Sequence, residues 1–512
     1  MEKSKRRAKS LAVLGTGSDV GKSIIVAGLC RLLHRAGVRV APFKAQNMSL
    51  NSFVTIEGGE IGRAQALQAQ ACGLFPHVDM NPILLKPESD QRSQVIVQGK
   101  VLDKTHARGY FERTNELFHY VKDSYERLAA DYEMVVIEGA GSAAEVNLRD
   151  RDIVNWRVAH LAEAPVLLVA NIDSGGVFAQ VVGTLDLISS DERARVQGIL
   201  INKFRGDQNL FLDGIKFLEA RTGIPVFGVI PFMRDLELDQ EDSISREQHG
   251  LSRFSDRHIN IAVALLPRMS NFTDFNSLAG ESDVALRYAR SPDELIGADV
   301  VIIPGSKNTI EDLEYLRGAG FVPAFQQHVE QARELIGICG GYQMLGREVR
   351  DPHGVESGGS VKGLGWLDVT TELTLQKTTR QIEAMVLDHG TATDMVLSGY
   401  YIHMGRTQRI TGLPCFKIVQ PSGHGERDLE EDGARSRDGL IWGTYIHGVF
   451  DSTAFRRFWL NGLRQRKGLF PLPLSVSTVT TERLQRQIDR WADHLQRHVQ
   501  WKSIVTMLSL EQ

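Results

Sequence analysis

The chain has 512 residues, 42% of them hydrophobic and 24% charged, with a formal net charge of −4. We therefore expect at least two globular domains, no long disorder and no nucleic-acid partner. No stretch approaches the ~18 consecutive apolar residues of a membrane helix, and the apolar run at 11–14 is too short for a signal peptide. These exclusions favour a cytoplasmic protein that acts on small molecules without a membrane partner, and they leave the oligomeric state open.

The first half of the chain alternates short β-rich runs with amphipathic stretches. This alternation predicts a parallel sheet covered by helices. The runs are 11–14, 38–41, 134–137, 166–170, 199–201 and 226–230. Residues 25–33 show apolar side chains at helical spacing between the first two runs, so this part is a predicted βαβ unit. We assign residues 1–234 to this α/β domain.

A glycine-rich loop follows the first predicted strand and opens the first predicted helix. In this context backbone N–H groups and a helix N-terminus bind phosphates. We expect Lys22 to reach the terminal phosphates of ATP and Ser23 to hold Mg²⁺, although an ordinary strand-to-helix turn is the alternative. The loop is one residue longer than GxxxxGK[ST]. The expected ATP-binding residues of the loop are Gly15, Thr16, Gly17, Asp19, Val20, Gly21, Lys22 and Ser23.

The longer loop resembles that of dethiobiotin synthetase, whose relatives activate carboxylates as acyl or carbamoyl phosphates. Glu138 directly follows the strand at 134–137, where its carboxylate can hold Mg²⁺ opposite the loop. A residue that caps the next turn is the alternative for Glu138. Asn202 and Lys203 follow the strand at 199–201 and are placed like purine-contacting residues of that superfamily.

Three polar residues follow the second predicted strand, on the ligand side of the sheet. They are Lys44, Gln46 and Asn47. We expect them to meet a substrate carboxylate or phosphate, and a polar surface loop is the alternative.

A second α/β series follows a polar stretch at 235–258, which we expect to be a linker. Runs at 259–266, 300–303, 335–338 and 440–446 predict a second doubly wound domain over 259–455. Residues 456–512 are expected to form a helical extension that packs without contributing chemistry.

Cys339 lies in a predicted strand–turn–helix at 335–346. A helix N-terminus favours a thiolate, and small neighbours such as Gly340 permit a strained backbone with free N–H groups for an oxyanion. The segment matches the nucleophile motif of class I glutamine amidotransferases over several consecutive residues. A buried cysteine in a glycine-rich turn is the alternative.

His447, at a predicted strand end farther along the chain, is the expected base for Cys339. Val449 stands where many class I domains carry an orienting acid, so a backbone carbonyl or another side chain must fill the third role. His403 is a competing base that we rank below His447. Gly305 and Ser306 follow the strand at 300–303 and are expected to present N–H groups to the oxyanion, with a simple turn as the alternative.

With both halves in view, the chain resembles the cobyric acid synthase family over essentially its whole length. The segments 42–52 and 144–155 look like that family's own signatures. The resemblance implies amidation of the b, d, e and g carboxylates of adenosylcobyrinic acid a,c-diamide, or its hydrogenobyrinic analogue, with ATP, Mg²⁺ and glutamine. The reaction would pass through an acyl phosphate. Because free ammonia is mostly protonated near neutral pH, we also expect a protected passage from Cys339 to the ATP site.

Two other functions fit parts of the sequence. The nearest is the sister cobyrinic acid a,c-diamide synthase, or another P-loop amidoligase, but the sister family carries a GPDY-type sequence where Gln46-Asn47 stands here. The other is a ParA-like ATPase switch with a degenerate C-terminal domain. The loop lacks the extra lysine of such switches, and the Cys339 motif is intact.

Overall fold

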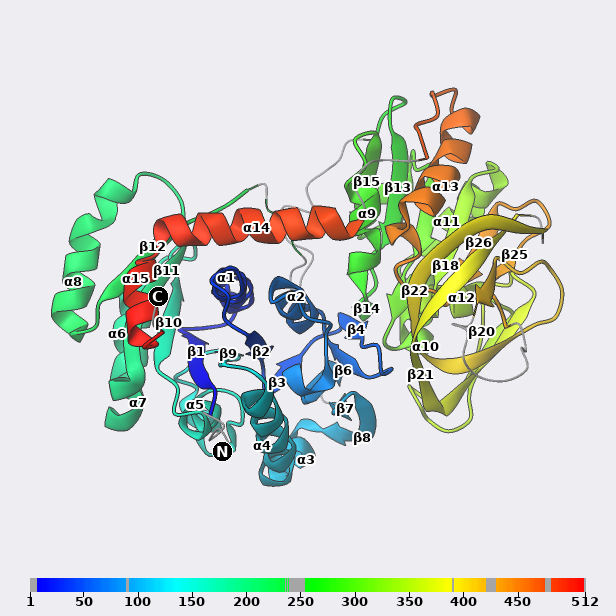
Figure 1. The fold of residues 1–512 in the computed structure, drawn as a ribbon. Helices are drawn as coiled ribbons and strands as arrows, with labels where there is room; N and C mark the ends of the chain where they lie inside the picture. Colours follow the sequence, from blue (N-terminus) through cyan, green and yellow to red (C-terminus); the bar gives the residue numbers. More distant parts are fainter. Residues whose placement is uncertain are drawn as a thin grey trace, which may run out of the picture.

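The protein is described from a computed structural model that covers residues 7–88, 92–234, 236, 238, 254–388, 391–419, 430–474 and 480–510. Figure 1 shows two α/β lobes side by side, with a long helix, α14, running along one edge. Most of the expected linker at 235–258 lies outside these residues. Within them, no helix combines the length and apolar character needed to cross a membrane.

The first lobe is built on a six-stranded parallel sheet, as predicted. Its order is β12 (Val226–Pro231), β11 (Val196–Phe204), β10 (Val166–Asn171), β1 (Lys9–Gly15), β9 (Met134–Glu138), β2 (Val40–Phe43). Both faces are covered by helices, which is why the strands are apolar throughout. The helices are α1 (Lys22–Arg35), α2 (Arg63–Ala71), α4 (Thr114–Asp131), α5 (Trp156–Leu161), α6 (Val177–Leu187), α7 (Ser190–Arg195) and α8 (Leu212–Thr222).

An insertion that the sequence did not predict extends this lobe toward the second one (Figure 1). It contains a four-stranded sheet and a β-hairpin, and the short helix α3 (Ala107–Glu112) directly follows the last strand of the sheet. The sheet is β3 (Gln46–Met48), β6 (Ile83–Pro87), β7 (Arg92–Val97), β8 (Lys100–His106), and the hairpin is β4 (Ser52–Val54), β5 (Glu60–Gly62). The signature segment 42–52 therefore runs from the central sheet to the boundary between the lobes.

The second lobe also has a six-stranded sheet, parallel except for its last strand. Its order is β15 (Val284–Ala289), β13 (Ile259–Ala264), β16 (Val300–Ile303), β18 (Glu334–Ile338), β26 (Ile441–Thr444), β25 (Ala434–Arg435). The helices around it are α9 (Asn276–Ala279), α10 (Thr309–Gly318), α11 (Phe321–Glu330), α12 (Gly340–Leu345) and α13 (Thr453–Arg466).

A mostly antiparallel layer, not predicted from the sequence, packs on this lobe. Its main part is a long hairpin of β21 (Val369–Asp388) and β22 (Thr391–Arg409). The shorter strands of the layer are β19 (Glu348–Asp351), β20 (Gly359–Lys362), β23 (Phe416–Val419) and β24 (Glu431–Asp432). The hairpin brings residues from both long strands to the boundary between the lobes (Figure 1).

The last helices, α14 (Thr480–His498) and α15 (Trp501–Met507), return to the first lobe (Figure 1). Trp491 Nε1 donates to the carbonyl of Ile24 in α1 at 2.6 Å. Asp489 pairs with Arg31 at 2.6 Å. The apolar face of α14 therefore belongs to the core of the first lobe.

Candidate active site

The phosphate-binding loop joins β1 to α1 at the carboxyl edge of the first sheet (Figure 1). Lys22 Nζ donates to the carbonyls of Gly17 and Gly141, each at 2.9 Å, so its side chain lies across the loop. Gly21 has a φ of 94°, and a Cβ there would lie 2.2 Å from Asn202 Nδ2. Only glycine fits this position.

Asn202 and Lys203, at the end of β11, also reach the loop. Asn202 Nδ2 donates to the carbonyl of Val20 at 2.9 Å, and Lys203 Nζ pairs with Asp19 Oδ1 at 2.9 Å. The structure therefore brings these two residues, which lie far away in the sequence, to the loop that was expected to hold the nucleotide.

Glu138 is fully buried at the end of β9, next to the start of α1. Ser23 Oγ and Lys44 Nζ both donate to Glu138 Oε1, at 2.7 and 2.9 Å. Hydroxyl and carboxylate oxygens are ligands that Mg²⁺ prefers, with phosphate and water oxygens completing its shell. The described residues contain no group of three His, Cys, Asp or Glu able to hold a metal alone. Ser23 Oγ and the Glu138 carboxylate are oxygen donors of the kind that a magnesium ion bound together with a nucleotide would use.

The three polar residues after β2 do not share one environment. Lys44 and Asn47 are buried, with Asn47 Nδ2 donating to Gln65 Oε1 at 3.0 Å. Gln46 accepts a hydrogen bond from Tyr110 and lines a cavity of about 690 Å³. Of the three, Gln46 is the one that borders open space large enough for a ligand.

This cavity lies beside the phosphate-binding loop. One wall is formed by residues of the segment 140–157, which begins two residues after the end of β9 and includes the second signature stretch. Arg149, Arg151 and Arg157 line the cavity together with apolar side chains of Val146, Leu148 and Trp156. Its size falls within the ~300–1,000 Å³ typical of small-molecule sites.

Cys339 occupies a strained elbow between β18 and α12. Its φ of 51° and ψ of −106° are rare for a residue with a side chain. The elbow is held by a hydrogen bond from Cys339 N to the carbonyl of Thr444 at 2.8 Å. A Cβ at Gly341 would lie 2.0 Å from the carbonyl oxygen of Ile303, so the turn requires glycine there. This geometry is that of a nucleophile elbow.

His447 lies fully buried beside Cys339 and next to Asp274, which belongs to the 3₁₀ turn Phe272–Phe275. His447 Nδ1 lies 2.7 Å from Asp274 Oδ2, and Gly448 N donates to Asp274 Oδ1 at 3.0 Å. Burial lowers the pKa of His447, but the charges of Asp274 and Cys339 and their hydrogen bonds outweigh this and raise it to about 10. Asp274 thus takes the place of the orienting acid that the sequence did not identify.

The expected oxyanion residues lie against the elbow. Gly305 and Ser306 form the short strand β17 (Gly305–Ser306), which pairs with β14 (Met269–Ser270). A Cβ on Gly340 would lie 2.8 Å from Ser306 N, and one on Gly305 would lie 3.2 Å from His447 Cε1. The structure therefore brings Gly305, Ser306, Gly340 and His447 together around Cys339.

His403 is close to the same site but differs chemically from His447. Its ring stacks on Tyr445 with centroids 3.8 Å apart. Burial, and then the neighbouring His447, lower the pKa of His403 to about 3, so its ring is neutral near neutral pH. His447 has the carboxylate partner that a proton-accepting base needs, and His403 lacks one in the part of the chain described.

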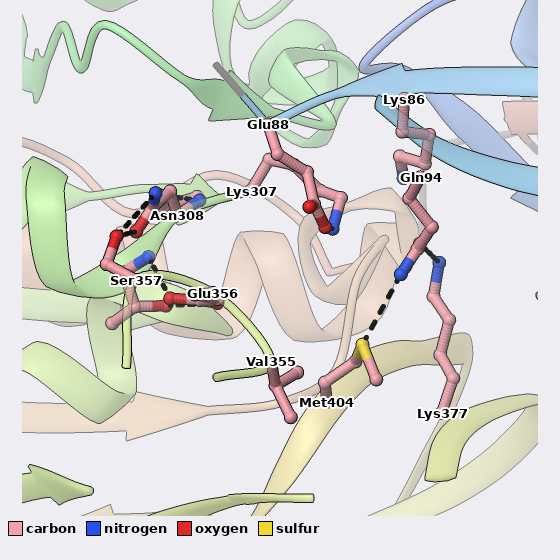
Figure 2. Close-up of polar contacts among 12 residues, drawn as sticks. Lys86, Glu88, Gln94, Lys307, Asn308, Val355, Glu356, Ser357, Lys377 and Met404 are labelled. Carbon is pink, nitrogen blue, oxygen red and sulfur yellow. Dashed lines mark hydrogen bonds and ion pairs between the residues drawn. The ribbon is translucent and has the colours of Figure 1, made fainter. Parts of the chain in front are cut away.

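A small pocket of about 40 Å³ beside Cys339 is lined from both lobes. Lys86 of the first lobe and Lys307 and Lys377 of the second contribute to it. Glu60 binds both Lys86, at 2.8 Å, and Lys377. Figure 2 shows Lys377 next to Gln94, whose amide also contacts Met404 Sδ at 3.5 Å. Burial lowers the pKa of Lys377 to about 7 although Glu60 opposes this.

In comparisons with known proteins, different families match the N-terminal and C-terminal parts of the chain. The family described as "CobB/CobQ-like glutamine amidotransferase domain" matches residues 260–455, and "CobQ/CobB/MinD/ParA nucleotide binding domain" matches 11–244. The cobyric acid synthase of Syntrophobacter fumaroxidans is 47% identical over 98% of this chain and 99% of its own length. That of Klebsiella pneumoniae is 49% identical with the same coverage. Among solved structures, PurLQS from Thermotoga maritima aligns with a TM-score of 0.29 and 13% identity, over 46% of this chain and 99% of that chain.

Proposed function

Because the chain belongs to the cobyric acid synthase family, we propose that it amidates the b, d, e and g carboxylates of adenosylcobyrinic acid a,c-diamide or of its hydrogenobyrinic analogue. The chain is a glutamine-dependent ligase of cobalamin biosynthesis, which removes the ATPase-switch alternative. The observation that supports the coupled reaction best is the pocket beside Cys339, because Lys86 of the amidation lobe forms part of its wall.

In this proposal the first lobe activates the substrate carboxylate. A carboxylate oxygen attacks the terminal phosphorus of ATP, giving an acyl phosphate and ADP. Lys22 stabilises the charge on the transferred group, and Glu138 and Ser23 hold Mg²⁺, which neutralises the phosphates when it is bound. Ammonia then attacks the acyl carbon, the amide forms, and phosphate leaves.

The second lobe releases that ammonia from glutamine. Cys339 attacks the side-chain amide of glutamine, while backbone N–H groups near Ser306 and Gly340 stabilise the oxyanion. His447 protonates the departing ammonia, leaving a thioester that water converts to glutamate and free Cys339. Asp274 keeps the imidazole in the orientation and tautomer that this proton transfer requires.

The cavity of about 690 Å³ is the seat we propose for the corrin ring. It borders the phosphate-binding loop, because its wall includes Gly141, whose carbonyl accepts from Lys22. Arginines such as Arg151 suit a ligand with several carboxylates, and the apolar wall suits the ring itself. Gln46 lies at this cavity and at the position that separates the family from the sister diamide synthases.

Ammonia must travel from the pocket beside Cys339 to the acyl phosphate. We propose that it passes between the lobes, past Lys86 and Lys377, which both bind Glu60. A buried route keeps ammonia unprotonated, because bulk water near pH 7 would convert most of it to ammonium.

The assignment is tested by mass spectrometry of adenosylcobyrinic acid a,c-diamide incubated with the protein, Mg-ATP and glutamine, alongside an ammonium-salt control. We expect four successive amidations with either nitrogen source. Conversion of cobyrinic acid to its a,c-diamide instead would identify the sister reaction. ATP hydrolysis without any amidated corrinoid would refute the proposed substrate.

A further inference from the structure

Two segments next to Cys339 in the second lobe are contacted by residues of the first lobe. The first is the turn that carries Asp274, and the second is the oxyanion strand β17. Both are contacted by side chains from the insertion of the first lobe, at buried positions. Residues of the first lobe thus help to fix the positions of the groups that flank Cys339.

Asn51 and Ser52 contact the turn that carries Asp274. Phe272 N donates to Asn51 Oδ1 at 3.0 Å, and Ser52 N donates to Asn271 Oδ1 at 3.1 Å. Asn51, Ser52 and Asn271 are each at most 2% exposed. Asn271 has a φ of 51°, a conformation that a non-glycine residue keeps only when its surroundings fix it.

The turn fixed in this way sets the position of the catalytic histidine. Asp274 lies two residues beyond Phe272 and is 2.7 Å from His447. Asn271 Nδ2 itself lies 3.4 Å from His447 Nδ1. A displacement of Asn51 therefore moves the residues that orient His447.

Glu88 contacts the residue that follows the oxyanion strand β17. Its carboxylate lies 2.8 Å from Lys307 Nζ, and the two side chains are 8% and 10% exposed (Figure 2). Lys307 follows Ser306 directly, and its backbone N–H donates to the carbonyl of Arg268 at 3.0 Å. The Glu88–Lys307 pair therefore fixes the strand that is expected to supply the oxyanion donors, together with one wall of the small pocket beside Cys339.

The same insertion is connected to the proposed magnesium site through α2. Gln65 of α2 donates to Glu138 Oε2 at 3.3 Å, and the N–H of Arg63, the first residue of α2, donates to the carbonyl of Asn51 at 3.2 Å. One short helix thus contacts both the carboxylate at the phosphate site and the residue that holds the Asp274 turn. A shift of α2 on nucleotide binding would therefore move both its contact with Glu138 and its contact with Asn51.

We propose that Asn51 and Glu88 are positioning residues of the glutaminase site, through which glutamine hydrolysis responds to occupancy of the nucleotide and corrinoid sites. This inference rests on the reactions assigned above to the two lobes. It makes the first lobe a structural part of the glutaminase and limits loss of ammonia when no carboxylate has been activated.

The test compares Asn51→Ala with the full-length wild type and with the matched control Asn209→Ala, which changes an exposed asparagine in the turn just before α8. Glutamate release is measured alone and with Mg-ATP plus adenosylcobyrinic acid a,c-diamide, and amidation is measured with glutamine and with ammonium salt. We expect the wild type and the control to be stimulated by ATP and corrinoid. Asn51→Ala should lose this stimulation and about tenfold or more in glutamine-driven amidation, but keep ammonia-driven amidation.

Two further measurements separate positioning from general damage. Glu88→Gln should mainly raise KM for glutamine, because Lys307 loses the negative charge beside it. Asn51→Ala should instead mainly lower kcat. In a double-mutant cycle, adding Asn51→Ala to Asp274→Asn should cost little more glutaminase activity than Asp274→Asn alone. Thermal melting of every variant checks that it is folded.

Several results would overturn the inference. Wild-type glutamate release that ignores ATP and corrinoid would contradict the response, and unchanged glutaminase in both variants would contradict the positioning. Equal losses with glutamine and ammonia would place Asn51 in amidation instead. If the assigned substrate is wrong, neither the wild type nor any variant will amidate the corrinoid. Glutamate release will still show whether Asn51→Ala differs from its control.

Discussion

Asp274→Asn tests the least expected feature of the glutamine site. The substitution keeps the size of the side chain but removes the charge that lies 2.7 Å from His447 Nδ1. At an effective dielectric constant of ~20, two unit charges about 4 Å apart interact by about 4 kcal/mol, or about 3 pKa units. The pKa of His447, about 10 in the intact site, should therefore fall to about 7 or below.

The substitution also changes the tautomer. An asparagine amide can donate to Nδ1, which leaves the proton on Nε2, the nitrogen that must exchange a proton with Cys339 and the leaving ammonia. In a serine protease triad the corresponding change costs about 10⁴-fold in kcat, and we expect a loss of about 10²–10⁴-fold in glutamate release here.

The assay is glutamate release and glutamine-driven amidation over pH 6–10, with ammonia-driven amidation as the internal control. The control rate should stay near that of the wild type, because Asp274 lies outside the phosphate site. Glutaminase within about tenfold of the wild type, with an unchanged pH profile, would show that Asp274 does not orient His447. Asn209→Ala serves again as the matched variant.

Three other changes have expected results. Lys22→Ala should lower amidation about 10²-fold or more with either nitrogen source, and retained amidation would refute the phosphate-loop assignment. Cys339→Ala should abolish amidation from glutamine but keep it from ammonium, whereas loss of both would reveal a structural role for the thiol. Burial raises the pKa of Glu356 from 4.5 to about 7, although Lys307 opposes this, so the folded state retains a proton that the unfolded chain releases and stability falls as pH rises through 4.5–7. Glu356→Gln should therefore raise the melting temperature more at pH 8 than at pH 5, and an equal change at both would contradict this reasoning.

Much of the candidate site could be predicted from short stretches of sequence. The phosphate loop and the Cys339 elbow are each formed by consecutive residues, so their strand–turn–helix geometry can be predicted from composition and order alone. His447 could be predicted because it closely follows an apolar strand, β26. The parallel order of each sheet followed from the alternation of apolar runs and amphipathic stretches.

Other parts depend on contacts that no local pattern encodes. Asp274 lies in a short turn without a motif, and the packing of that turn against the segment Val449–Asp451 brings it to His447. The long strands β21 and β22 have mixed polar and apolar faces, so they lack the continuous apolar runs that marked the central strands. The surroundings of Lys44 and Asn47, which we predicted to meet a ligand, also depend on distant residues: both are buried, and Lys44 binds Glu138.

The return of α14 to the first lobe has a consequence for dividing the protein into fragments. Trp491 and its neighbours complete a core that begins at β1 and α1, so a fragment ending at residue 238 would expose the face of α1 that contacts this helix. The complementary fragment, starting at 239, would carry the missing helix as an unpartnered amphipathic segment. Coexpressed, the two pieces should recognise each other and reassemble, whereas either piece made alone should aggregate through its uncovered surface.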